Sequence, residues 1–309
     1  MFMKAQRTQA KLRLALCGPS GSGKTYSALL LARGLAPDGP IALIDTERGS
    51  GQLYAHLTEY DVAPLAPPYT PERYIDLIKQ AEQSGYAVLI IDSLSHAWSG
   101  EGGILDMHDK ATLASRSGNS FAAWREVTPK HNQLVDTLIS ANLHVIVTMR
   151  TKTAYDLSDD GSGKKRPIKV GLAPVQREGM EYEFTVVMDL SVDGHIATAA
   201  KDRTGLFDGS HWVISQATGD QLRTWMETGM DVTDLSRQLL DKLKGHVLAI
   251  DNVPHLNSWW RAVDNTLLFW VIVAALMVIV SAANRIAMAP HTEFRAAIKH
   301  LPCSEEAEP

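Results

Sequence analysis

Cysteine is almost missing from this chain of 309 residues, which contains only two. Cys17 ends an apolar stretch and Cys303 lies in a polar tail, so neither a disulfide framework nor a cysteine-based zinc site can be formed from them. Such usage is typical of a reducing compartment, and we expect a cytoplasmic protein. The first residues also lack the continuous apolar segment of a signal peptide.

A strong net charge is missing as well. The formal charge is −5, with 45% hydrophobic and 21% charged residues, a globular balance that argues against global disorder. A nucleic-acid partner would therefore need a local basic patch, because the field of the whole molecule does not attract it. The length allows one large α/β domain with an appendage, or two modest domains.

Short apolar runs alternate with helical patterns through most of the chain. Strands are expected at 12–17, 41–44, 87–91, 144–148, 184–190 and 196–200. Helices are expected at 24–35, from 70 to about 85, and at 120–140. This alternation predicts an α/β fold with a central, mostly parallel sheet flanked by helices. Asp193-Gly194 predicts a hairpin between the last two strands, and the polar segment 151–175 is expected to be a loop.

The pattern changes after residue 228, which predicts a domain at 1–228 and a C-terminal helical appendage at 229–309. Asp231 to Lys244 reads as an amphipathic helix. The segment 267–283 is apolar and uncharged, at the short end of the range for a membrane-spanning helix. A membrane anchor, a buried helix, a subunit contact and a frame-shifted tail all remain alternatives for this segment.

The sequence GPSGSGKT, from Gly18 to Thr25, matches the phosphate-binding pattern G-x-x-x-x-G-K-[ST] in full. Its glycines let successive backbone N–H groups point inward at phosphate, and the helix that follows adds its positive dipole end. Lys24 is expected to reach the β and γ phosphates, and Thr25 to ligate Mg²⁺. The alternative is a flexible glycine loop with a chance Lys-Thr pair. We predict ATP and Mg²⁺ as cofactors, bound by Gly18, Pro19, Ser20, Gly21, Ser22, Gly23, Lys24, Thr25 and Tyr26.

Asp92 follows the apolar run 88–91 and is the second predicted metal residue, beside Thr25. A buried strand that delivers one carboxylate at its carboxyl end is typical of α/β ligand sites. The alternative is a helix-capping role, because Ser93 and Ser95 come next.

Glu47 lies just past the expected strand 41–44, on the same side as the phosphates. We predict that it is the general base that activates water. Asp45, nearer the strand, is expected to be more buried. The alternative for Glu47 is an exposed loop acid paired with Arg48.

Taken together, these segments resemble the RecA-like ATPases. GPSGSGKT followed by IALIDTERGSGQLY is similar to that family's P-loop and its strand ending in Asp-x-Glu, and AVLIIDSLSH is similar to its magnesium strand. With KDRTG the resemblance covers about residues 10–215, and it is closer to the phage-encoded RecA-like ATPases proposed to act in single-strand annealing or recombination. It implies a RecA-like core that hydrolyses ATP on single-stranded DNA, in a bacterial or phage-infected cell. It also implies that Glu47 activates water and that Asp92 associates with magnesium.

The same resemblance implies a homo-oligomer, either a filament or a ring. Lys201 and Arg203 resemble a Lys-x-Lys pair that reaches the neighbouring subunit's ATP, so both are expected to be catalytic in trans. Thr148 falls where the family often has a Gln that senses the γ-phosphate, although Thr is shorter. A single-strand-binding protein is a further candidate partner.

The segment 150–177 lies where the family places a DNA-binding loop, and we expect single-stranded DNA to bind there. Its basic residues are Arg150, Lys152, Lys164, Lys165, Arg166, Lys169 and Arg177. The alternative is a solvated surface loop, because three aspartates dilute the charge.

Two other classes of function stay open. A P-loop small-molecule kinase would need an acceptor-binding region and an arginine-rich lid, and the IDTE strand end is not expected there. A non-catalytic ATP-dependent interaction protein, membrane-tethered through 267–283, would bind ATP without turnover.

Overall fold

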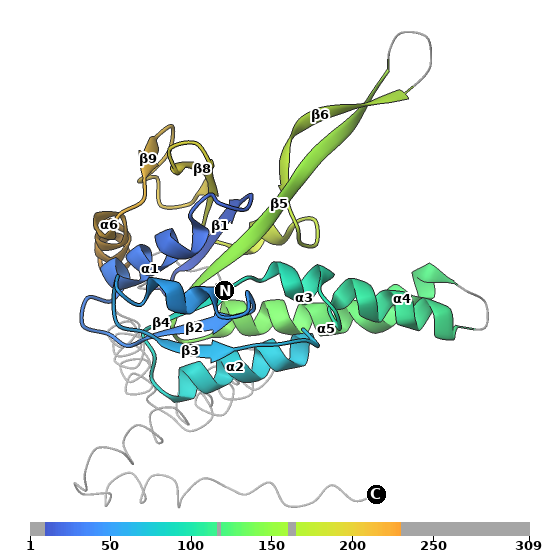
Figure 1. Ribbon diagram of the computed structural model, residues 1–309, viewed down its shortest axis with the longest axis horizontal. Coiled ribbons are helices and arrows are strands. Elements are labelled where there is room, and N and C mark those ends of the chain that lie inside the picture. The colour runs from blue at the N-terminus through green and yellow to red at the C-terminus, as the bar shows by residue number, and fades with distance from the viewer. Residues whose placement is uncertain (1–9, 116–118, 160–164, 230–309) are drawn as a thin grey trace, which may run out of the picture. The chain divides into compact units, whose positions relative to one another are not determined.

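The computed structural model describes residues 10–115, 119–159 and 165–229 (Figure 1). The predicted appendage, including Asp231 to Lys244 and the apolar segment 267–283, lies outside the described residues. The described part is built of strands and helices in alternation, as the sequence predicts.

The strands are β1 (Arg13–Gly18), β2 (Ile41–Asp45), β3 (Asp61–Pro64), β4 (Val88–Asp92), β5 (His144–Asp159), β6 (Lys165–Pro174), β7 (Val186–Leu190), β8 (Ile196–Asp202) and β9 (His211–Val213). The α-helices are α1 (Lys24–Leu35), α2 (Pro71–Gln83), α3 (Ser95–Ser99), α4 (Ile104–Ala114), α5 (Ser120–Ser140) and α6 (Gln216–Glu227). Two 3₁₀ turns, η1 (Ser50–Tyr54) and η2 (Met180–Glu183), complete the set. The expected helices at 24–35 and 120–140 are confirmed to the residue.

The sheet has the strand order β3-β2-β4-β5-β1-β7-β8-β9, with β6 paired to β5 outside this path. The strands from β3 to β7 along this order are parallel, and β8 and β9 are antiparallel additions. The predicted fold class, α/β with a mostly parallel sheet, is therefore confirmed. The predicted hairpin at Asp193-Gly194 is confirmed too, where Gly194 adopts the positive φ of 66° that such a turn needs.

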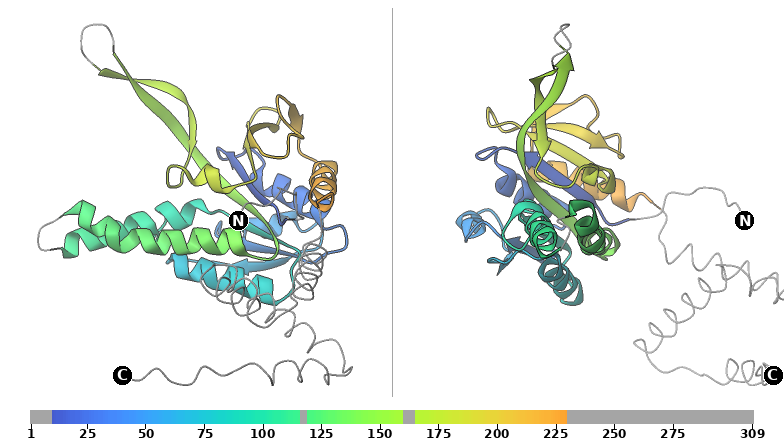
Figure 2. Two further views of the ribbon diagram at one scale, coloured as in Figure 1. Left: turned by 180° about the vertical axis from the view of Figure 1, so that it is seen from behind. Right: turned by 90° about the vertical axis from the view of Figure 1, so that its right-hand side faces the viewer.

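The sheet is covered on both faces, which explains why its central strands are continuous apolar runs. One core cluster joins α2 and α5 to one face, through residues such as Tyr74, Ile78 and Leu134. The other joins α1 and α6 to the opposite face, through residues such as Leu31 and Leu222 (Figure 2). A helical layer on each side makes the sheet a rigid platform whose ends remain open to ligands.

The expected loop over 151–175 is wrong. β5 continues from the sheet to Asp159 and pairs antiparallel with β6, from Thr151 opposite Pro174 to Asp159 opposite Lys165. This two-stranded projection, here named the β-arm, leaves the body of the domain (Figure 1). Its polar composition suggested a loop, but Thr151, Thr153, Tyr155 and Leu157 recur at every second position, which is the period of a strand.

Candidate nucleotide-binding and hydrolysis site

The predicted site residues of β1, β2 and β4 meet at one end of the sheet. Gly18 at the end of β1 lies opposite Arg150, and Asp45 at the end of β2 lies opposite Asp92. Because all these strands are parallel, their carboxyl ends form one edge, which is where α/β proteins bind ligands. β5 lies between β1 and β4, so Thr148 also reaches this edge.

The P-loop has the backbone that phosphate binding requires. Gly23 adopts a φ of 83° as the N-cap of α1, and no acidic side chain stands in the first turn of that helix. A Cβ on Gly18 would lie 2.4 Å from Ser22 Oγ and 2.8 Å from Leu190 O, so the loop tolerates only glycine there. The helix N-terminus therefore points its positive dipole end at the loop, with no acidic side chain in its first turn to oppose an anion.

Lys24 folds back over this loop. Its Nζ donates to the carbonyl oxygens of Gly18 at 3.0 Å and Pro19 at 2.8 Å. Burial lowers the pKa of Lys24, and the nearby Asp92 carboxylate opposes that shift. The ammonium thus sits at the P-loop with carbonyl partners that a phosphate can replace.

Asp92 accepts a hydrogen bond on each carboxylate oxygen. Thr25 Oγ1 donates to Oδ2 at 2.5 Å and Thr148 Oγ1 donates to Oδ1 at 2.5 Å. The side chain is buried, and this burial raises the pKa of Asp92, while the two hydroxyl donors oppose the increase. The helix-capping alternative is not seen, because the N-cap of α3 is Leu94 and makes no side-chain cap.

Thr25 and Asp92 fit the needs of a magnesium ion. Mg²⁺ takes most of its ligands from water and substrate phosphates and needs only one or two protein oxygens. The described residues contain no group of three His, Cys, Asp or Glu side chains that could hold a metal by themselves. Thr25 Oγ1 and Asp92 Oδ2 would supply the protein side of a site that the nucleotide completes.

Glu47 projects from a turn that Asp45 organises. The Asp45 carboxylate, 2% exposed, accepts from the backbone N–H of Glu47 at 2.7 Å and of Gly51 at 3.2 Å. The expected burial of Asp45 is therefore confirmed. Glu47 pairs with Arg150, not with Arg48: Arg150 Nη2 lies 2.7 Å from Oε1 and 2.8 Å from Oε2.

A cavity of about 380 Å³ opens beside Glu47, and its lining residues are Thr46, Glu47, Arg48, Pro67, Tyr69, His96, Glu101 and Arg150. His96 Nδ1 lies 2.6 Å from Thr46 Oγ1, and its ring stacks on Tyr69 at 4.8 Å between centroids. Burial, and then the Arg150 charge, lower the pKa of His96. Sequence reasoning missed this histidine because no spacing signal links it to Glu47.

Lys201 and Arg203 are not brought to the P-loop of their own chain. β8 runs antiparallel to β7, so its end at Asp202 lies opposite Val186, at the amino end of the sheet. Lys201 Nζ donates to the carbonyl of Tyr182 at 2.7 Å, and Arg203 Nη2 donates to the same oxygen at 3.0 Å. The turn that does reach the P-loop carries His195, whose Nδ1 would lie 3.3 Å from a Cβ on Gly23.

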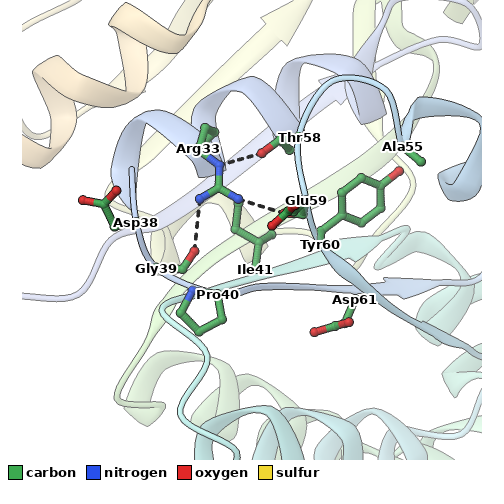
Figure 3. Close-up of a pocket in the computed structure, with 10 residues that line it drawn as sticks. All are labelled: Arg33, Asp38, Gly39, Pro40, Ile41, Ala55, Thr58, Glu59, Tyr60 and Asp61. Atoms are coloured by element: carbon green, nitrogen blue, oxygen red, sulfur yellow. Dashed lines mark hydrogen bonds between the residues drawn. The ribbon is translucent and has the colours of Figure 1, made fainter.

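A second, larger cavity of about 570 Å³ lies at the amino end of β2, between the end of α1 and β3 (Figure 3). Arg33 points into it and donates to Thr58 Oγ1 at 2.5 Å and to the carbonyls of Gly39 and Glu59 (Figure 3). None of the predicted site residues lines this cavity. The Arg33 guanidinium already donates its hydrogen bonds to oxygens of the protein. We therefore place the functional site at the P-loop edge.

Comparisons with known proteins add a distant likeness of fold. Among the solved structures, the chain is similar to the RadB recombinase, with 15% identity over 68% of this chain and 90% of that one and a TM-score of 0.36. No functional conclusion follows from a likeness of this kind. None of the curated proteins matches the chain significantly. Among the described residues, no helix has both the length and the apolar character to cross a membrane.

Residues 10–218 match the AAA domain family, and this range holds the P-loop, Glu47, Asp92 and the central sheet. ATP and magnesium binding are general properties of such domains. With its P-loop between β1 and α1 and Asp92 at the end of β4, the chain belongs to the AAA domain family of P-loop ATPases.

Proposed function

We propose that this chain hydrolyses ATP with Mg²⁺ and uses the reaction to act on single-stranded DNA in phage recombination or annealing. The observation that carries the hydrolytic part is the hydrogen bond of 2.5 Å between Thr25 on α1 and Asp92 at the end of β4. That contact builds the protein half of a magnesium site beside Lys24. Glu47 stands at the end of the neighbouring strand β2.

The site residues divide the chemistry among them. Lys24 exchanges its carbonyl partners for the β and γ phosphate oxygens, and Thr25 and Asp92 would hold the metal. A magnesium ion held there would neutralise charge on the phosphates. Glu47 accepts a proton from the water that attacks the γ-phosphorus, while the bond to the bridging oxygen of ADP breaks.

The DNA part of the proposal rests on the β-arm and on the resemblance in sequence. The segment 150–177 carries seven basic residues, of which Lys164 lies outside the described residues, and most of the segment forms the projecting β-arm. Lys152 near the root of the β-arm is exposed, and Arg177 just beyond the β-arm is half-buried. A projecting cationic hairpin can follow a phosphate backbone, and such contacts are strongly salt-dependent.

The assembly part follows from the position of Lys201 and Arg203. They lie at the opposite end of the sheet from their own P-loop, which supports a role at the site of a neighbouring copy over a role at their own. We propose a filament or ring in which one subunit completes the next subunit's site, and a single-strand-binding protein as a candidate partner on DNA.

The test is ATP turnover measured with and without single-stranded DNA, together with DNA binding across a salt titration in the presence and absence of ATP. We expect turnover that DNA stimulates and binding that weakens steeply with salt. Phosphate transfer to a small acceptor would instead show a kinase. ATP binding without any turnover would show a non-catalytic interaction protein.

A further inference from the structure

Arg150 holds Glu47 in a two-point contact. Its Nε lies 3.1 Å from Glu47 Oε1, and its Nη2 lies 2.7 Å from Oε1 and 2.8 Å from Oε2. This is the planar fork that arginine offers to a carboxylate. Both oxygens that would accept a proton from water are engaged, and the side chain is turned toward Arg150.

Arg150 also stands at the junction between the sheet and the β-arm. It is the last residue of β5 paired with β1, opposite Gly18. The next residue, Thr151, is the first one paired with β6, opposite Pro174. The strand therefore changes partners at Arg150.

The backbone of Arg150 is fixed from both sides of this junction. Its N–H donates to Ser95 Oγ at 2.9 Å, on α3. Its carbonyl accepts from the N–H of Val175 at 2.7 Å, where the β-arm returns to the domain. The residue whose side chain binds Glu47 is therefore bonded directly to both the body of the domain and the returning end of the β-arm.

We propose that Arg150 is a positioning residue that holds Glu47 away from the attacking water until the β-arm is engaged. This inference rests on the proposed role of Glu47 as general base. Binding of single-stranded DNA to the β-arm shifts Arg150, the fork opens, and Glu47 turns to the γ-phosphate. The Arg150–Glu47 ion pair then couples DNA binding on the β-arm to ATP hydrolysis at the P-loop.

The exposure of the pair suits a contact that must open and close. The Arg150 side chain is 48% exposed and that of Glu47 is 29% exposed. Pairs in such a setting are weak and are screened by salt. A buried ion pair would hold Glu47 in one position, whereas the half-exposed Arg150–Glu47 pair can be opened by a modest movement.

The decisive experiment compares basal ATP turnover, without DNA, in the wild type and in Arg150→Met. Removal of the fork should raise kcat by about two- to fivefold, the range set by the strength of exposed pairs, with KM for ATP unchanged. The ratio of the two rates should fall toward one as salt rises, because screening opens the pair in the wild type. Stimulation by single-stranded DNA should shrink by the same factor.

Two variants make this result specific. Arg150→Lys keeps the charge but loses the fork, so its kcat should lie between the other two. Lys79→Met removes an exposed cation from α2, outside the site, and should leave kcat unchanged. A lower or unchanged kcat in Arg150→Met would overturn the proposal.

Glu47→Gln separates this inference from the proposed function. If Glu47→Gln turns over like the wild type, Glu47 is not the base and the proposed chemistry fails. If Glu47→Gln is inactive while Arg150→Met is not accelerated, hydrolysis stands and only the role of Arg150 is wrong.

Discussion

The two ends of the sheet use similar polar side chains for different purposes. At the carboxyl end, Thr25 and Thr148 bind the carboxylate of Asp92, and Glu47 faces a cavity. At the amino end, the polar side chains bind backbone groups. Arg13 donates to the carbonyls of Leu143 and Ile139 at 2.8 Å, and to that of Ala141. His144 Nδ1 accepts from the N–H of Leu12 at 3.0 Å.

The difference follows from the direction of the backbone. The P-loop presents N–H groups and a helix N-terminus, which attract anions and need a cation such as Lys24 nearby. At the other end, α5 terminates in carbonyls without helical partners, which Arg13 satisfies. Polar groups at the carboxyl end are therefore available to a ligand, whereas those at the amino end stabilise the fold.

Lys24→Ala tests the carboxyl end most severely. It removes the ammonium that the P-loop holds in place, so ATP binding should be abolished. Titration with a fluorescent ATP analogue checks this, with Lys79→Ala as the matched control on α2. Near-normal affinity in Lys24→Ala would mean that the nucleotide binds elsewhere.

Arg203→Ala asks whether the amino end also takes part in catalysis, in trans. An arginine supplied by a neighbouring subunit contributes about 10³–10⁵-fold in rate, so turnover should fall by that order while ATP affinity is kept. A mixture of Arg203→Ala with Lys24→Ala should recover part of the activity, because an intact P-loop can then meet an intact Arg203. The specific activity of the wild type should also rise with protein concentration.

The contrary result for Arg203 is equally informative. If turnover is unchanged and only thermal stability falls, Arg203 is a structural donor to the carbonyl of Tyr182, like the other cations of the amino end. No recovery in mixtures of folded, co-assembling variants would also exclude the trans role.

Glu47→Gln keeps the shape of the side chain but removes the base. We expect ATP binding to persist and single-turnover hydrolysis to fall by about 10²–10⁴-fold. Asp45→Asn is the comparison, because Asp45 is buried and shapes the turn. A larger fall in turnover in Asp45→Asn than in Glu47→Gln would argue that Glu47 is not the base.

Neutralising Lys164, Lys165 and Arg166 together tests whether the β-arm extends the ligand-binding end of the molecule. The slope of log affinity against log salt for single-stranded DNA should decrease by roughly two, at about 0.7 for each phosphate that the variant no longer binds. Neutralising Lys79, Lys110 and Lys130 on the helices removes the same charge and should leave the slope unchanged. Equal effects in the two triple variants would mean that only the overall charge matters.

The smallest expected effect concerns stability: protonation of His144, at the amino end of the sheet, should lower the free energy of unfolding in acid. Burial lowers its pKa to about 4, and the Lys11 and Arg13 charges add to this shift. The unfolded histidine binds a proton near its ordinary pKa of about 6.5, so acid favours unfolding. The free energy of unfolding should fall by about 2–3 kcal/mol between about pH 6.5 and pH 4 on this account.

Urea unfolding of the wild type and of His144→Gln over that pH range checks the prediction. His96 and His131 also have pKa values lowered first by burial, so the variant should lose part of the pH dependence and not all of it. An identical pH profile in the two proteins would exclude His144 as a contributor.

Elements with local signals could be predicted from the amino-acid sequence. The P-loop lies in one stretch of chain, and the helix at 24–35 follows from its own apolar face. The shared edge of Asp92 and Glu47 could be predicted because Asp92 ends one strand and Glu47 lies two residues past another, and parallel strands bring their carboxyl ends together. The alternation at 151–157 was present too, although its polar composition concealed the β-arm.

Which of these groups touch one another depends on the three-dimensional arrangement of the strands. The insertion of β5 between β1 and β4 brings Thr148 to Asp92 and Arg150 to Glu47, across 56 and 103 residues of sequence. The antiparallel direction of β8 sends Lys201 and Arg203 to the end opposite the P-loop. Strand order and direction arise from packing two helical layers against the whole sheet, and no short segment encodes that packing.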